Sequence, residues 1–311
     1  MQAYVGENDT QRQKIAAQYL NTVPASDLLD ALEQKYPLCN TEAHPLGRAV
    51  FDRTQNLSAA IAQCGTKCSD GCFHGAMMEM FSTQNDTFGG LVNDADPESV
   101  LADVESLAHD LCFKPEVAKF IALSPCIHGL GHVFIYLSNY DLKGALAACK
   151  SLGSSARASD CAGGVFMEFM SHSADDPRVS GKEYYPCDEF SAYSVSCYRY
   201  KASSMLTVWG DKQEALGACE ALDTNSRLAC IRGVGHAVSI QQKITMPSTD
   251  DFWNICGSVE TSPEHQACVK GVIDNVLINV DPASLESACG KMPVQYRPTC
   301  LQIAHAIKNL N

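Results

Sequence analysis

Hydrophobic positions recur with a helical period along much of this chain. When the first residue of CIHGLGHVF (126–134) is set at 0° and each residue advances 100°, the apolar side chains gather between about 340° and 100°. The same stripe appears in two segments, made by Ile127, Leu130, Val133 and Phe134 and by Ile231, Val234 and Val238. The alternation typical of strands is absent. The pattern predicts an all-α protein.

This helical segment belongs to an internal repeat. Aligned on a cysteine, the copies read CFHGAMMEMF, CIHGLGHVFI, CAGGVFMEFM, CYRYKASSML, CIRGVGHAVS, CVKGVIDNVL and CLQIAHAIKN, and they begin at residues 72, 126, 161, 197, 230, 268 and 300. Glycine stands three places after the cysteine in five of these seven copies. HPLGRAVF at 44–51 parallels HGLGHVF at 128–134 and is a degenerate copy without the cysteine. A period near 35 residues indicates helix–turn–helix units.

A second cysteine precedes most copies and marks another helix. Eight residues before it stands a residue that favours the helix N-cap, in five units: Asn56, Asp141, Asp211, Ser248 and Asp281. Each unit is therefore predicted to contain a two-turn helix A that ends near the first cysteine. A loop of about ten residues and a helix B that begins at the second cysteine follow.

The sixteen cysteines predict disulfides within the hairpins. The expected pairs are Cys112–Cys126, Cys149–Cys161, Cys187–Cys197, Cys219–Cys230, Cys256–Cys268 and Cys289–Cys300. Among the remaining four cysteines, Cys64–Cys72 and Cys39–Cys68 are favoured, although the sequence leaves this pairing open. Because disulfides persist in oxidising compartments, we expect an extracytoplasmic protein, periplasmic or secreted. The N-terminus has no apolar signal region, so the signal peptide is expected to be absent from this chain.

Composition narrows the classes of partner. The formal net charge is −13 and charged residues make up 19% of the chain, which argues against nucleic acid and anionic membranes. No apolar run approaches the roughly 20 residues that span a bilayer, so no transmembrane segment is expected. The expected partners are a small anionic substrate, a peptide or another protein.

The repeats predict a single array of about seven α-hairpins over residues 39–311. The array would be an α-solenoid or, if it closes on itself, an α/α toroid. Residues 1–38 are expected to form an N-terminal helical cap, with Ser26 as N-cap of a helix at 27–36. The architecture resembles Sel1-like and tetratricopeptide repeats stapled by cysteines, although the Sel1 alanine, glycine and tyrosine pattern is absent. The C-x-H-G, C-x-H-G-x-G-H and G-V-F-M-E elements resemble those of uncharacterised exported prokaryotic proteins.

Two repeat positions carry candidate chemistry. The second and sixth residues after the cysteine lie at about 200° and 240°, away from the apolar stripe and on one face of helix B. Histidines at these positions predict a site for copper or zinc made by His44, His74, His128 and His132. Further candidate ligands are Met78, Met167, His236, Glu79 and Glu168. The two glutamates lie at about 340° and need the approach of another helix to act as ligands.

Cations at the same repeat position predict an anion-binding strip of Arg199, Arg232 and Lys270. The alternative is that acidic residues of neighbouring A helices neutralise the strip. The functional hypothesis is an exported metal-binding repeat protein, and an enzyme if the metal keeps an open position beside an anionic substrate. The competing hypothesis is a non-enzymatic repeat scaffold that binds a peptide, a protein or an anionic ligand.

Overall fold

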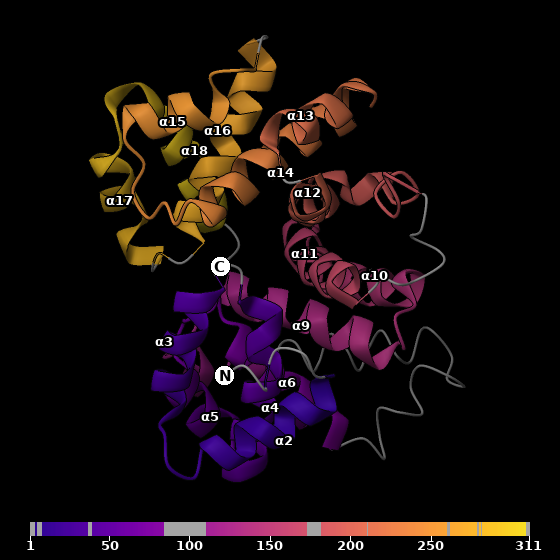
Figure 1. Cartoon of the computed structure of the whole chain (residues 1–311), viewed down its shortest axis with the longest axis vertical. Coiled ribbons are helices and arrows are strands. Elements are labelled where there is room, and N and C mark those ends of the chain that lie inside the picture. Colours follow the sequence, from indigo (N-terminus) through magenta and orange to yellow (C-terminus); the bar gives the residue numbers. More distant parts are fainter. Residues whose placement is uncertain are drawn as a thin grey trace. The chain divides into compact units, whose positions relative to one another are not determined.

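A computed structural model describes residues 4, 8–36, 39–83, 110–172, 182–209, 211–259, 262–278, 280 and 282–308. All regular elements in these ranges are helical (Figure 1), so the all-α prediction is confirmed. None of the helices described here combines the length and the hydropathy needed to cross a bilayer.

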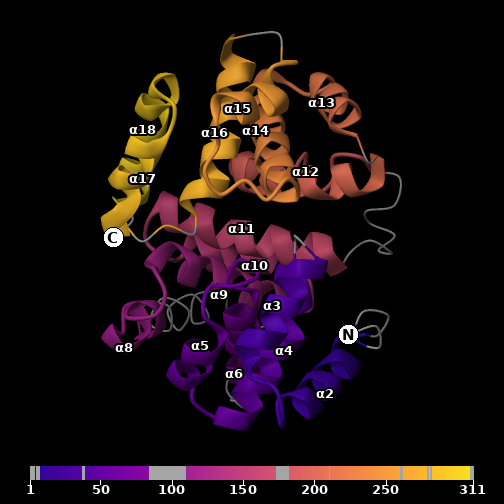
Figure 2. The same cartoon turned by 60° about the vertical axis from the view of Figure 1, so that its left-hand side comes forward.

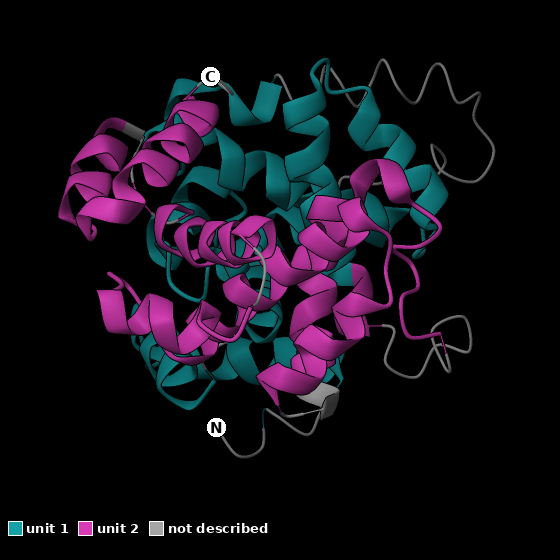
Figure 3. Cartoon of the chain, turned by 90° about the horizontal axis from the view of Figure 1, so that it is seen from above, with its two compact units in different colours: residues 1–168 teal, residues 169–311 magenta. Residues whose placement is uncertain are grey.

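The chain forms two compact units, residues 1–168 and 169–311 (Figure 3). Unit 1 contains α2 (Asp9–Tyr19), α3 (Ala25–Lys35), α4 (Asn40–Thr54), α5 (Leu57–Cys64), α6 (Gly71–Thr83), α8 (Pro115–Ala118), α9 (Leu123–Leu137), α10 (Leu142–Lys150) and most of α11 (Ser155–His172). Unit 2 contains α12 (Ser194–Trp209), α13 (Lys212–Glu220), α14 (Thr224–Gln241), α15 (Thr249–Cys256), α16 (Ser262–Leu277), α17 (Leu285–Lys291) and α18 (Arg297–Lys308), with short 3-10 turns before α12, α17 and α18. The single array over 39–311, as a solenoid or a toroid, stays a prediction.

The predicted starts of the A helices are confirmed wherever the structure describes them. Asn56, Asp141, Asp211 and Ser248 are the N-caps of α5, α10, α13 and α15, and each side chain accepts a hydrogen bond from a backbone N–H of the first turn. Ser248 and Asp251 form a reciprocal capping box. The predicted cap Asp281 lies outside the described residues.

The predicted start of helix B holds for α6, which begins at Gly71 beside Cys72, but is wrong for the other B helices. Helix B begins before its cysteine, at Ser155 for Cys161 and at Thr224 for Cys230, so the loop after helix A is much shorter than ten residues. Asp223 caps α14 by accepting hydrogen bonds from the N–H groups of Asn225 and Ser226. In these two hairpins the disulfide therefore joins the end of helix A to the second turn of helix B rather than to its first residue. This placement leaves room for a complete N-terminal turn before the bridge.

All eight predicted disulfides are confirmed, including Cys39–Cys68 and Cys64–Cys72. No cysteine is free. Each cysteine is at most 3% exposed, so the bridges lie inside the hydrophobic core beside the apolar stripes. The bridges therefore add covalent constraints to helices that already pack against one another by hydrophobic burial.

Two helices, α2 and α3, occupy the segment that was expected to be a cap. They pack on α4, and α3 also packs on α5. The predicted N-cap Ser26 is wrong, because α3 begins at Ala25 after Pro24 and Ser26 lies inside its first turn. Because the fixed φ of proline is compatible with a helix start, Pro24 indicates the beginning of this helix, and the prediction overlooked it.

Glycines set the distance between paired B helices. A Cβ atom built on Gly131 of α9 would lie 2.0 Å from the carbonyl oxygen of Cys161 in α11, and one on Gly164 would lie 1.9 Å from that of His128. The same reciprocal contact joins α4 to α6 through Gly47 and Gly75, and α14 to α16 through Gly235 and Gly271. Figures 1 and 2 show α14 next to α16 from two directions. Only glycine permits this close backbone approach.

We predict opposite effects for two Gly→Ala substitutions in unit 2. Gly271→Ala should lower the free energy of unfolding by about 3 kcal/mol, because its Cβ would lie 1.9 Å from the carbonyl oxygen of Arg232. Gly217→Ala, in α13, should raise the free energy by about 1 kcal/mol, because its Cβ meets no atom within 4 Å and alanine favours helix. Chemical denaturation monitored by circular dichroism measures both changes. Equal effects would contradict the role assigned to the helix crossing.

Candidate metal centre

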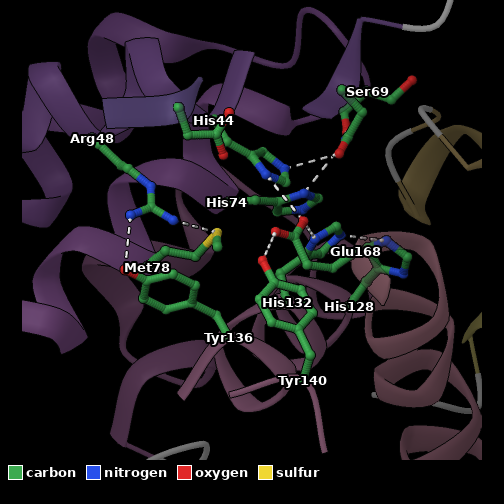
Figure 4. Close-up of polar contacts among 12 residues, drawn as sticks. His44, Arg48, Ser69, His74, Met78, His128, His132, Tyr136, Tyr140 and Glu168 are labelled. Atoms are coloured by element: carbon green, nitrogen blue, oxygen red, sulfur yellow. Dashed lines mark hydrogen bonds and ion pairs between the residues drawn. The ribbon is translucent and has the colours of Figure 1, made fainter. Parts of the chain in front are cut away.

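Three histidines from three helices converge inside unit 1 (Figure 4). Ring nitrogens of His44 in α4, His74 in α6 and His132 in α9 lie within 4.8 Å of one another. The three residues are between 0% and 1% exposed. Burying three imidazoles together costs desolvation free energy unless each finds a partner, so the cluster is not ordinary core packing.

Glu168 of α11 lies at the centre of this cluster. Its Oε2 is 2.9 Å from Nδ1 of His132 and 3.2 Å from Nδ1 of His44. Complete burial would raise the pKa of Glu168, but His44 and His132 outweigh this effect and hold the pKa well below its usual value. The cluster therefore contains one buried negative charge surrounded by imidazoles.

Asn40 fixes the orientation of His44. The Asn40 amide nitrogen donates to the carbonyl oxygen of Ser69, so its Oδ1 is the atom that faces Nε2 of His44, at 3.1 Å. Because Oδ1 can only accept, His44 carries a proton on Nε2. The other ring nitrogen, Nδ1, faces Glu168 and does not meet hydrogen-bond geometry there. In the neutral form of the ring, which is the form that binds metals, this nitrogen is the one with the free lone pair.

His74 contributes a buried ring nitrogen that has no partner. Its Nε2 makes no hydrogen bond, and its ring stacks on that of His132 with 4.6 Å between centroids. Burial, followed by the charges of His132 and His128, lowers the pKa of His74 well below its usual value. His74 therefore stays neutral at physiological pH, which is the form that binds metals. Gly129 gives its ring room, because a Cβ there would lie 2.9 Å from Cδ2 of His74.

His128 lies at the edge of the cluster rather than at its centre. It is half-buried, whereas the three converging histidines are fully buried. Its Nε2 is 3.2 Å from Nε2 of His132, whose other nitrogen contacts Glu168. His128 thus connects the buried centre with the partly exposed surface of α9.

A tyrosine and an arginine adjoin the centre. Tyr140 donates a hydrogen bond of 3.4 Å to Oε1 of Glu168, whose Oε2 contacts His44 and His132. Burial, together with the charge of Glu168, raises the pKa of Tyr140, so the hydroxyl stays protonated and remains a donor. Arg48 is also buried and donates to the hydroxyl of Tyr136 at 3.2 Å, with its guanidinium 4.5 Å from the centre of that ring.

Arg48 also accounts for two of the predicted additional ligands. Its Nη2 lies 4.0 Å from the sulfur of Met78, and its Nη1 lies 3.9 Å from Oε2 of Glu79. Met78 and Glu79 therefore contact a guanidinium rather than the histidine cluster. Met167 precedes Glu168 in α11 and is half-buried. His236 belongs to unit 2, where its ring lies 6.3 Å from the ring of Tyr200.

The predicted cation strip of unit 2 is partly neutralised. Asp274 of α16 accepts two hydrogen bonds from Arg232, of 2.6 and 2.8 Å, and lies 3.2 Å from Nη2 of Arg199. The acidic residue comes from a B helix, not from the expected A helix. Lys270 is half-buried and has no ion-pair partner among the residues that the structure describes.

Sequence reasoning missed Asn40 and Tyr140. It gave Glu168 as a further candidate ligand that needs the approach of another helix. The α9–α11 crossing supplies that approach and brings Glu168 to His132. Asn40 precedes His44 by one helical turn, a spacing that could have identified it as a neighbour.

Comparisons with protein-family models, with curated proteins and with solved structures find no match to this chain.

The buried histidine of unit 2 makes a testable contribution to pH-dependent stability. His236 is 3% exposed, both its ring nitrogens lack hydrogen-bond partners, and burial followed by the charge of Arg199 lowers its pKa to about 3. Between pH 6.5 and 3 the unfolded chain binds a proton here that the folded chain does not bind. The contribution of His236 to the free energy of unfolding is therefore fully present above pH 6.5. As the pH falls below this value, the free energy of unfolding decreases by about 1.4 kcal/mol per pH unit.

We predict that His236→Leu reduces the loss of stability on acidification. Guanidinium denaturation of metal-free protein at several pH values between 6.5 and 4 should give a slope smaller by about 1.4 kcal/mol per pH unit than the wild-type slope. The exposed His305→Leu serves as control and should leave the slope unchanged. Identical slopes for wild type and His236→Leu would show that His236 titrates normally in the folded chain.

Proposed function

We propose that this protein binds one divalent transition-metal ion in unit 1. His44, His74 and His132 are the nitrogen ligands and Glu168 is the fourth ligand. The four groups come from α4, α6, α9 and α11, so the ion would connect four helices at one point. Metal binding would then add to the stability of the folded unit, since the site does not exist in the unfolded chain.

The contact between His44 and Glu168 carries this proposal. Nδ1 of His44 and the ionised Oε2 of Glu168 are 3.2 Å apart in a fully buried place. These two atoms repel each other unless a proton on Nδ1 or a metal cation beside both of them separates them, and a metal ion can take the place of that proton. Donors bound at 2.0–2.2 Å to a tetrahedral ion are about 3.3 Å apart, close to the 2.9 and 3.2 Å observed around Glu168.

The donor atoms favour zinc over copper. Three imidazoles and one carboxylate form a set typical of zinc, and the thioether that would favour copper(I), Met78, contacts Arg48 instead. Zinc is also inert to redox change, which suits a chain whose cysteines are all in disulfides. Tyr140 on the outer oxygen of Glu168 and Asn40 on His44 would orient the two ligands from the second shell.

The disulfides and the buried centre support an exported metal-binding helical protein. His128 is the partly exposed member of the cluster and would provide the route by which the ion or a small ligand enters. An enzyme would use this side of the centre for its substrate. A non-enzymatic scaffold would use the ion to hold the four helices together, and the complete burial of all four proposed ligands favours this structural use.

We predict that the four ligand positions differ from His128 in their effect on metal content. Wild-type protein without a histidine tag should hold one equivalent of zinc by elemental analysis. His74→Ala and Glu168→Gln should lower the affinity at least 100-fold, because each removes a ligand. His128→Ala should keep the stoichiometry and lower the affinity about 10-fold, as the loss of an outer partner does. His305→Ala, an exposed histidine, is the matched control.

Circular dichroism of the metal-free variants separates loss of metal from loss of fold. Helicity close to that of wild type is expected, because the disulfides and the glycine crossings remain intact. Full metal content in Glu168→Gln, or no binding of zinc or copper by reconstituted wild-type protein, would refute the proposal.

A further inference from the structure

Unit 2 repeats the framework of the histidine cluster with different side chains. The α14–α16 crossing has the same two glycine–carbonyl contacts as the α9–α11 crossing, made by Gly235 and Gly271. Arg232 and His236 hold the positions in α14 that His128 and His132 hold in α9. Asp274 of α16 accepts hydrogen bonds from Arg232 across this crossing, and Glu168 of α11 contacts His132 across the other one, from a position one residue further along the repeat. One type of helix crossing thus assembles a buried polar cluster in each unit.

The charge of the unit 2 cluster has the opposite sign. Arg199 and Arg232 share the single carboxylate of Asp274, so these three groups sum to one positive charge. Burial alone would raise the pKa of Asp274, but the two guanidinium groups hold it below its usual value, so the carboxylate is ionised. His236 is neutral and adds no charge. In unit 1, by contrast, the single carboxylate of Glu168 lies among imidazoles and contacts no guanidinium in the described contacts.

Arg232 and His236 have nitrogen atoms that no described residue engages in a hydrogen bond. Asp274 occupies Nε and Nη2 of Arg232, and Nη1 has no hydrogen-bond partner among the described residues. The side chains of Arg232 and Arg199 are 29% and 25% exposed, so a ligand can reach them from solvent. His236, one turn after Arg232 on the same face of α14, is 3% exposed and makes no hydrogen bond through either nitrogen.

We propose that unit 2 binds a carboxylate group at Arg199, Arg232 and His236. The second edge of the Arg232 guanidinium matches the planar, two-oxygen geometry of a carboxylate. One carboxylate charge balances the single positive charge of the cluster, and the neutral imidazole of His236 donates to the same group. The carboxylate can belong to a small organic acid or to the C-terminus of a peptide, and none of the proposed metal ligands takes part in this site.

Titrations of the full chain with acetate, triglycine and triglycine amide test the proposal. Binding is followed by calorimetry and by the NMR resonances of arginine Nε–H groups. Acetate and triglycine should bind saturably at one site, and triglycine amide should not bind. Similar affinities for acetate and triglycine indicate a small acid as the ligand, whereas much tighter binding of triglycine indicates a peptide C-terminus.

Two substitutions should move the affinity in opposite directions. Arg232→Gln should weaken acetate binding at least tenfold, because it removes the planar pair of donors. Asp274→Asn should tighten binding severalfold, because it removes the carboxylate that competes for the guanidinium groups. Arg227→Gln on the same helix removes a surface ion pair with Glu264 and should change nothing. Circular dichroism verifies the fold, and the double variant Arg232→Gln/Asp274→Asn, which leaves no unmatched buried carboxylate, replaces Arg232→Gln if that variant does not fold.

Absence of saturable binding by both acetate and triglycine would overturn the proposal. Weaker binding in Asp274→Asn than in wild type would also overturn it, because a purely structural ion pair would respond in that way. Saturable binding of inorganic phosphate without binding of either carboxylate would show that the assigned ligand class is wrong.

Discussion

The contact of a glycine with the carbonyl group of a neighbouring helix is the constraint on which both polar clusters depend. Each of three helix pairs has two such contacts. In one contact the carbonyl belongs to the cysteine that begins a repeat, and in the other it belongs to a residue whose side chain is part of a polar cluster. The axes approach so closely that side chains beyond the crossing must meet. Glu168 reaches His132 in one pair, and Asp274 reaches Arg232 in another. Any larger residue at the crossing would separate these partners.

Electrostatics then distinguishes one unit from the other on this shared framework. Imidazole side chains at the second and sixth repeat positions can be neutral, so a lone carboxylate among them attracts a cation. Guanidinium side chains at the second position stay charged at all relevant pH values, so a single carboxylate does not balance two of them. A few substitutions after a duplication would suffice to reverse the preference of the buried site, because the backbone need not change.

The sequence predicted the parts of this fold that depend on local chemistry. Helix N-caps such as Asn56 and Asp211 and the close disulfide pairs follow from short spacings along the chain. The repeat alignment also grouped His44, His74 and His132, but placed them away from the apolar stripe and did not predict their burial. The helix crossings could not be predicted, because repeat alignment places equivalent residues on a common strip without giving the angle between helices. For this reason the central position of Glu168 and the pairing of Arg199 with Asp274 emerged only in three dimensions.

The local nature of the disulfides has a consequence for the biogenesis of the chain. Seven of the eight bridges join cysteines between 8 and 14 residues apart, and the eighth spans 29. Neighbouring thiols close such loops at the smallest entropic cost, so each hairpin can oxidise soon after it emerges into an oxidising compartment. Sixteen cysteines allow very many wrong pairings, and vectorial emergence of the chain removes most of them before the later thiols arrive.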